Sequence, residues 1–221
     1  GQLHSRESSG AQTHSASVPA MIQSLLADAG LKLAQCDALA FGMGPGSFTG
    51  VRTACGLAQG LAYGASLRVA PVVTLMAMAE AARQSGAGND VLAVLDARMG
   101  EVYWAQYRFD GGWHCVSEPA LCASSMVVAT GTPVVCGNGL SAYPEGFAQL
   151  GDLQRLPAIM PHAQSLAMLA VDMVNDHALL APRDAQPLYL RNKVALTTAE
   201  RMAAAGVNAG ANADANAGAG A

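Results

Sequence analysis

The chain has 221 residues, of which 52% are apolar and 13% charged, and its formal net charge at pH 7 is −4. This composition is typical of a globular protein, and the 12 basic residues are spread too thinly for a dense cationic surface that binds nucleic acid directly. No apolar run approaches the roughly 20 residues of a membrane span, and the polar start lacks the apolar core of a secretory signal. We therefore expect a cytoplasmic protein that contacts no membrane.

The first half of the chain predicts alternating helices and strands. Apolar residues at helical spacing, a Gly/Pro-rich turn and short runs of valine mark the boundaries. The expected elements are a helix over residues 18–29 with Ser17 as its N-cap and Gly30 as its stop, a strand over 37–41, a helix over 48–63, a strand over 69–73, and a helix that Thr74 caps and that ends near Gln84.

The second half continues this alternation and adds a hairpin. Aromatic and β-branched residues flank Asp110-Gly111-Gly112, which is a turn sequence. The expected elements are a strand over 91–95, a hairpin over 101–116, a weak helix over 123–129, a strand over 134–136 and a helix over 163–177. The order favours an α/β protein. Residues 197–221 are mostly Ala, Gly and Asn, which predicts a disordered tail.

A glycine-rich turn, Gly42-Met43-Gly44-Pro45-Gly46-Ser47, separates the strand over 37–41 from the next helix. Ser47 or Thr49 can cap this helix, and a helix N-terminus attracts anions. The candidate anion site consists of Gly44, Gly46, Ser47 and Thr49. No Lys-Ser/Thr pair follows the glycines, so the phosphate-loop pattern is absent, and a purely structural turn is the alternative.

The helix after this turn carries a stripe of glycine. Arg52, Gly56, Gly60 and Gly64 recur every four residues, and each interior glycine costs a helix about 0.5–1 kcal/mol relative to alanine. Close packing against another backbone would offset that cost. The groove, with Val51 and Leu57 beside it, is either a docking face for a partner helix or a contact with the protein's own sheet.

Residues that could perform catalysis or bind metal have simpler interpretations. Asp96, Arg98 and Glu101 follow an apolar strand, but an Asp and an Arg two residues apart favour a local ion pair that fixes the turn. His14 has no second histidine four residues later and is expected to cap the helix or lie on the surface. The five cysteines form no CxxC pair and are expected to be reduced core thiols. We therefore assign no catalytic residue and no metal ligand.

Three segments carry a resemblance to a known protein family. They are GMGPGSFTGVR at residues 42–52 followed by GLAQGLA at 56–62, LDARMGEVYWAQY at 95–107, and PLYLR at 187–191. Together they resemble the TsaB (YeaZ) family, and the similarity extends over about residues 14–194.

The resemblance implies an actin-like fold (the ASKHA group) of two ribonuclease-H-like lobes, one over residues 1–95 and the other over 96–196. Members of this family ordinarily begin with β-strands that are not recognisable in this sequence. We therefore expect a first lobe that lacks its N-terminal strands, has an exposed sheet edge and tends to associate.

The resemblance also implies a function. TsaB proteins are non-catalytic subunits of the machinery that makes threonylcarbamoyladenosine in tRNA, and they pair through first-lobe helices with the TsaD-type transferase or with themselves. A TsaE-type ATPase joins the complex, tRNA is contacted only indirectly, and ATP or ADP is expected only within the complex. The alternative is an actin-like nucleotide-binding enzyme, a small kinase or ATPase, that uses the Gly-rich turn. Proteolysis has no recognisable residues.

Overall fold

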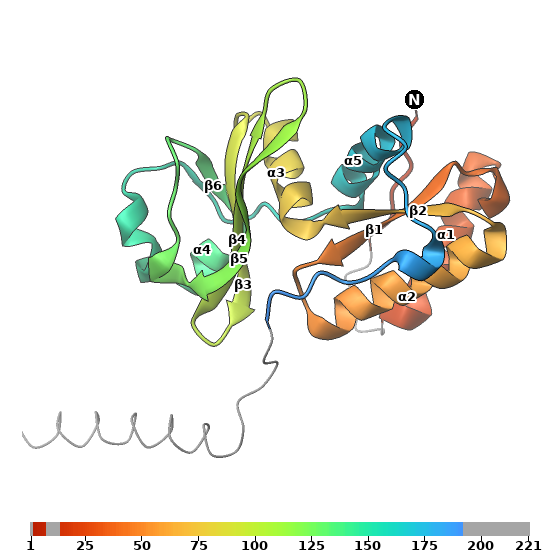
Figure 1. Ribbon diagram of the computed structural model, residues 1–221, viewed down its shortest axis with the longest axis horizontal. Coiled ribbons are helices and arrows are strands. Elements are labelled where there is room, and N and C mark those ends of the chain that lie inside the picture. The colour runs from red at the N-terminus through yellow and green to blue at the C-terminus, as the bar shows by residue number, and fades with distance from the viewer. Residues whose placement is uncertain (1, 8–13, 192–221) are drawn as a thin grey trace, which may run out of the picture. The chain divides into compact units, whose positions relative to one another are not determined.

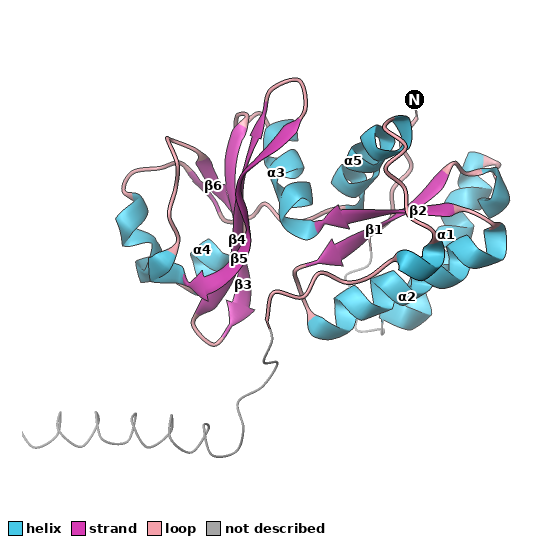
Figure 2. Cartoon of the chain, viewed as in Figure 1, coloured by secondary structure: helices cyan, strands magenta, loops and turns pink. Residues whose placement is uncertain are grey.

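The computed structural model describes residues 2–7 and 14–191, which form two β-sheets with helices packed on them (Figure 1; Figure 2). The helices and strands follow one another in the order α1 His14–Ala29, β1 Ala38–Gly44, α2 Phe48–Ala65, β2 Arg68–Val73, α3 Thr74–Gln84, β3 Asp90–Arg98, β4 Glu101–Phe109, β5 Trp113–Ala123, β6 Val134–Cys136, α4 Gly139–Ala142, β7 Arg155–Leu156 and α5 Ala163–Asn175. Short 3-10 turns occur at η1 Leu33–Gln35, η2 Ser124–Met126, η3 Pro144–Leu150 and η4 Pro182–Asp184.

The first sheet consists of β1 and β2, which are parallel and pair from Ala38 with Arg68 to Gly42 with Val72. Helix α2 connects the two strands and covers one face of the sheet, as a parallel crossover requires. Helix α5 packs against both strands on the other face, where Leu169 joins Val72 and Ala77 in a small core. Both faces of this sheet are therefore covered.

The second sheet has the strand order β5-β4-β3-β6-β7. Strands β3, β4 and β5 form an antiparallel meander. Strand β6 pairs with β3 in parallel, and β7 pairs with β6 in parallel. Helix α3 packs on one face through Leu75 and Met78, while Phe147 and Leu150 of η3 pack on the other. An antiparallel meander followed by two parallel strands is the ribonuclease-H-like arrangement that the sequence led us to expect.

Most of the predicted elements are confirmed, and the differences have local causes. Residues 123–129 hold only the single turn η2, because the stretch ends β5 and then packs with η3. Ser17 is not an N-cap, since α1 already begins at His14. Thr74 is the first residue of α3 rather than its cap, and Val73 takes the cap position.

The predicted domain division stays a prediction. Strand β3 runs from Asp90 to Arg98 and so passes through the expected boundary between residues 95 and 96. The expected disordered tail over residues 197–221 lies outside the described residues. Within the part of the chain that the structure describes, no helix is both long and apolar enough to cross a bilayer.

A buried carboxylate ties α3 to the hairpin of β4 and β5. Glu80 is only 3% exposed, and its carboxylate accepts hydrogen bonds from Arg83 Nη2 at 2.8 Å, from Gln84 Nε2 at 2.8 Å and from Trp113 Nε1 at 2.9 Å. Arg83 also lies 4.3 Å above the ring of Phe109. Burial by itself raises the pKa of Glu80, but the three donors outweigh burial and hold that pKa below its usual value.

We predict that Glu80→Gln lowers the free energy of unfolding at pH 7 by about 1–3 kcal/mol, because charged hydrogen bonds in the interior are lost. The folded-state pKa lies below the unfolded one, so the contribution of Glu80 is present above a pH of about 4.3 and is lost as the pH falls through the folded value. The difference between variant and parent should therefore shrink in acid. Urea unfolding at pH 7 and at pH 3 measures it, with the exposed Glu145→Gln as the matched control.

Candidate functional site

Helix α2 has one face packed on the first sheet and one face exposed. Cys55, Ala58 and Ala62 are buried and lie in the core that includes Phe41 and Val69. Small residues at these positions let the helix lie close to the strands. The residues on the opposite side are exposed, and we call them the exposed α2 face: Phe48, Arg52, Gly56, Gly60, Tyr63 and Gly64.

The glycine stripe does not pack on the protein's own sheet. A Cβ atom built at Gly56, Gly60 or Gly64 would have no neighbour within 4 Å among the described residues, and none of the three has a positive φ. Neither crowding nor backbone conformation therefore demands glycine here. Because glycine still weakens the helix, the fold by itself offers no reason for the stripe.

Arg52 stands at the N-terminal end of this face between two aromatic rings. Its guanidinium carbon is 3.3 Å from the ring centroid of Phe48 and 4.6 Å from that of Tyr189, and its Nη1 donates to the backbone oxygen of Phe48 at 3.2 Å. Cation–π contacts of this kind hold a guanidinium in place while leaving its edge accessible. Sequence analysis missed both rings. Helical spacing would have revealed Phe48, but no local pattern indicates Tyr189.

The segment over residues 180–190, which we call the C-terminal strap, brings Tyr189 to α2. It pairs with β2 where Leu180 and Val69 exchange backbone hydrogen bonds, and Gln59 Nε2 then donates to Ala185 O at 3.0 Å. Further on, Leu188 N donates to Met43 O at 2.7 Å. The strap thus runs from the outer edge of β2 along α2 to the Gly-rich turn.

The Gly-rich turn is shaped by this contact. Gly44 has φ +111°, and a Cβ there would lie 3.0 Å from Leu188 O, so glycine is required on two grounds. Val51 packs toward the turn rather than outward. A Cβ atom built at Gly44 or at Gly46 would lie 3.5 Å from Cγ1 of Val51. Leu57 is half-buried. Of the predicted interface residues, the structure brings Arg52 and the three glycines together on one exposed face.

Ser47 is the N-cap of α2, as predicted, and Thr49 lies within the first turn. The Oγ of Ser47 accepts the N–H of Gly50 at 3.4 Å, so this hydroxyl already serves the helix. Ser47 and Thr49 are both exposed, whereas Gly44 is buried beside the strap. The four residues of the candidate anion site are therefore split between a covered and an open part of the turn.

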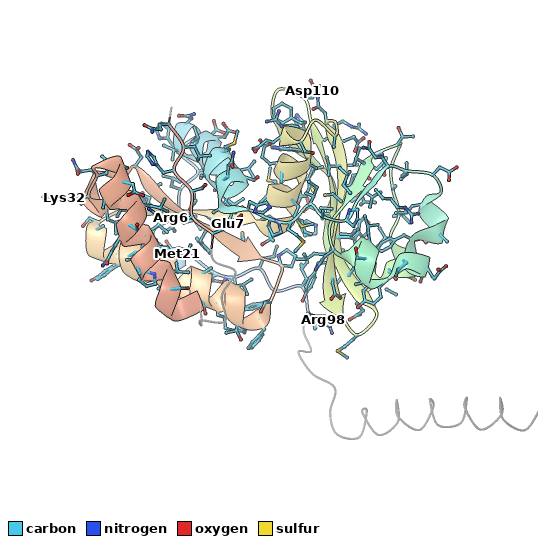
Figure 3. The ribbon with its side chains drawn as sticks, turned by 180° about the vertical axis from the view of Figure 1, so that it is seen from behind. Arg6, Glu7, Met21, Lys32, Arg98 and Asp110 are labelled. Carbon is cyan, nitrogen blue, oxygen red and sulfur yellow. The ribbon has the colours of Figure 1, made fainter. Side chains whose placement is uncertain are left out.

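Polar residues at the end of β3 hold a strained turn. Arg98 and Met99 have φ of +65° and +59°, a conformation that L side chains rarely adopt. Asp96 Oδ1 accepts Arg98 N at 2.8 Å and Tyr143 Oη at 2.9 Å, and Arg98 Nη1 lies 3.2 Å from Asp96 Oδ2. The predicted local ion pair is confirmed. Arg98 itself is exposed at the end of the hairpin (Figure 3).

The other candidate groups do not form a centre. Among the described residues, no cluster of three or more His, Cys, Asp or Glu side chains could hold a metal ion. His14 begins α1, and its side chain lies outside the described part of the structure.

The five cysteines are free thiols, of which Cys36 and Cys122 are half-buried. Cys55 and Cys136 are buried, but Cys115 is exposed, so the expectation of core thiols is wrong for Cys115. It pairs with Tyr107 of β4 and lies on β5, the edge strand of the second sheet. Burial raises the pKa of Cys136 to about 12, and burial together with the carboxylate of Glu118 raises that of Cys115 to about 11. Both thiols are protonated at neutral pH and are poor nucleophiles.

Comparisons with known proteins agree with the fold. Residues 7–136 match the family model described as "TsaD: tRNA N6-adenosine threonylcarbamoyltransferase". The chain is 40% identical over 190 residues to the tRNA threonylcarbamoyladenosine biosynthesis protein TsaB of Escherichia coli (strain K12), covering 82% of each chain. It is 39% identical over 196 residues to the protein of the same name from Haemophilus influenzae, covering 83% of this chain and 82% of that one. The solved structure of YeaZ from Pseudomonas aeruginosa superposes with a TM-score of 0.76 at 33% identity, covering 80% of this chain and 85% of the other.

We predict that Tyr143→Phe destabilises the turn after β3. The hydroxyl donates to Asp96 and accepts from Gly100 N at 3.2 Å, so its removal leaves two polar groups without this partner and should cost about 1 kcal/mol. Chemical denaturation measures the loss. Tyr63→Phe, at a tyrosine that is 84% exposed, is the matched control and should change nothing. Equal stability of the two variants would show that Tyr143 does not hold the turn.

Proposed function

The chain belongs to the TsaB family, and from this premise we propose that it acts in the biosynthesis of threonylcarbamoyladenosine in tRNA as a non-catalytic subunit. In this role it binds the TsaD-type transferase and supports transfer of the threonylcarbamoyl group to the anticodon-loop adenosine. The relatives named for this pathway are alike over about four fifths of the chain, which favours a shared role.

The observation that carries the proposal is the exposed α2 face. Three glycines in open space form a strip without side chains over about two turns of the helix. A second helix can approach such a surface until the two backbones are in contact, and the gain in packing offsets the cost of glycine in the free chain. A helix of the TsaD-type partner is the occupant that we propose.

Arg52 gives this face a fixed end. The rings of Phe48 and Tyr189 limit the rotamers of its guanidinium, so less side-chain entropy is lost when a partner contacts it. A guanidinium held in this way suits a carboxylate or the C-terminal carbonyl groups of a helix. We infer that Arg52 orients the partner helix, while the glycines let it come close.

The remaining parts of the proposal concern the assembly. A TsaE-type ATPase joins the pair, a second copy of the chain can compete for the same face, and ATP or ADP binds only in the complex. With a net charge of −4, the chain leaves contact with tRNA to its partner. Work on tRNA implies the cytoplasm.

The alternative function, a nucleotide-binding enzyme, has less support. Ser47 Oγ is used as the cap of α2, and the carboxylate of Asp96 is used by Arg98 and Tyr143. The named relatives favour the first function. Calorimetric titration of ATP into the isolated chain distinguishes the two, and we expect no heat of binding. Binding in the micromolar range that Ser47→Ala weakens would favour the enzyme.

We predict that Gly60→Leu folds normally but binds the TsaD-type partner more weakly. The new side chain meets open space, and the helix gains about 0.5–1 kcal/mol from the loss of glycine. On the exposed α2 face, however, it holds the partner helix away, and affinity should fall by about tenfold or more.

The matched control is Ala167→Leu, which adds the same side chain at an exposed small residue of α5. Thermal unfolding reports the fold, and calorimetry with purified TsaD-type protein reports binding. Unchanged affinity of Gly60→Leu would refute the proposed docking face, and a variant that does not fold would refute the assignment of Gly60 to open space.

A further inference from the structure

The C-terminal strap is held unequally along its length. Its first half, residues 180–185, which we call the anchored half, is bound at both ends. Leu180 and Val69 exchange two backbone hydrogen bonds of 2.9 and 3.0 Å, and the backbone oxygen of Ala185 accepts Gln59 Nε2 at 3.0 Å. Ala185 is only 2% exposed and belongs to the core between α2 and the first sheet. The anchored half is therefore part of the fold.

The second half, residues 186–190, which we call the distal half, runs beside α2 and is held more loosely (Figure 1). Leu188 N donates to Met43 O at 2.7 Å, and the ring centroid of Tyr189 lies 4.6 Å from the guanidinium carbon of Arg52. None of the residues of this half is buried. Segments with few buried contacts open locally at a low cost in free energy. The distal half can therefore leave its seat while the anchored half stays in place.

Seating of the distal half changes the surroundings of Arg52 on one side only. Phe48 belongs to α2 itself, so its ring and its backbone oxygen stay beside Arg52 in either state of the strap. The ring of Tyr189 leaves with the distal half. A guanidinium that is released on one side regains rotamers, and a partner then has to order it again at a cost in entropy. The seated strap therefore prepares the exposed α2 face for a partner.

The seat lies beneath the strap and not on the exposed α2 face. Gly44 is buried there, and a Cβ atom at this position would lie 3.0 Å from the backbone oxygen of Leu188. This spacing is tighter than ordinary van der Waals contact, so a side chain at position 44 pushes the distal half outward. Because Gly44 is covered, a partner docked on α2 does not touch it. A substitution here changes the seating and leaves the docking face itself intact.

We propose that the distal half of the strap is a two-state element whose seating regulates docking of the TsaD-type partner through Arg52. This inference rests on the proposed function, because it concerns the same face. In the seated state Tyr189 holds Arg52 and the face binds the partner well, and in the unseated state the same face binds it more weakly. The two equilibria are linked, so the partner favours seating by the same factor by which seating favours the partner.

Gly44→Ala tests the proposal by calorimetry with purified TsaD-type protein. When only the seated state binds well, the apparent dissociation constant is the intrinsic one divided by the seated fraction, and we expect a rise of about tenfold. Gly88→Ala is the matched control, because Gly88 also has a positive φ, +122° against +111°, but its Cβ would lie 4.0 Å from its nearest neighbour, Val134 Cγ2. It strains the backbone in the same way and should leave the constant unchanged. Unchanged affinity of Gly44→Ala would overturn the proposal.

Two further sets of variants show whether the strap acts through Arg52. In an Arg52→Ala background, Gly44→Ala should have little further effect on affinity, because the side chain that the strap positions is gone. An equal loss in both backgrounds would contradict the proposed route. Tyr189→Leu should weaken binding as Gly44→Ala does, whereas Tyr189→Phe keeps the ring and should bind like the parent chain. These two variants leave Gly44 in place, and equal affinity of the two would also overturn the proposal.

Amide hydrogen exchange measures the seating without any variant. In the isolated chain the N–H of Leu188 should exchange faster than that of Leu180 in the anchored half, and addition of the partner should slow it. Equal rates for the two amides would show that the halves open together and would refute a separate distal element. A parent chain that does not bind the partner refutes the proposed function, whereas binding that Gly60→Leu weakens and Gly44→Ala does not refutes the role of the strap alone.

Discussion

The close packing of α2 on the first sheet is the constraint on which the rest of the proposed site depends. Cys55, Ala58 and Ala62 are small enough for the helix to lie against Phe41 and Val69, and this contact excludes water from the core of the sheet. Once that side of the helix is committed to the core, the opposite side has to face outward. The stripe of glycines is exposed because the stripe of small apolar residues is buried.

The C-terminal strap completes what the packing of α2 begins. It closes the outer edge of β2, and the backbone oxygen of its Ala185 accepts a hydrogen bond from Gln59. Further on it reaches Met43 and the Gly-rich turn, so residues far apart in the chain become neighbours. The ring of Tyr189 in the strap lies against the guanidinium of Arg52 and helps to hold it in place. The proposed docking face is held by both the helix and the strap, and a surface that is already ordered loses less entropy when a partner binds.

The polar groups near the strand ends and in the core are engaged in holding the fold. Glu80 joins α3 to the β4–β5 hairpin, and Asp96 with Tyr143 supports a turn in which Arg98 and Met99 have positive φ. The donors around Glu80 hold its pKa below the usual value, so that carboxylate serves poorly as a base. In the described part of the chain, the surface that stands out is the exposed α2 face.

The sequence by itself determined the alternation of helices and strands, the hairpin at Asp110-Gly111-Gly112, a helix cap at Ser47 or Thr49, and the family, because these depend on local spacing and on motifs of adjacent residues. It also located the glycine stripe, but not which way the stripe faces, since a groove on a helix can meet its own sheet or another protein. Only the tertiary structure decided that Gly56, Gly60 and Gly64 lie in open space among the described residues and that the ring of Tyr189 lies against Arg52. These features arise from contacts between residues that are distant in sequence, and the free energy of such contacts depends on how whole elements pack rather than on any local pattern.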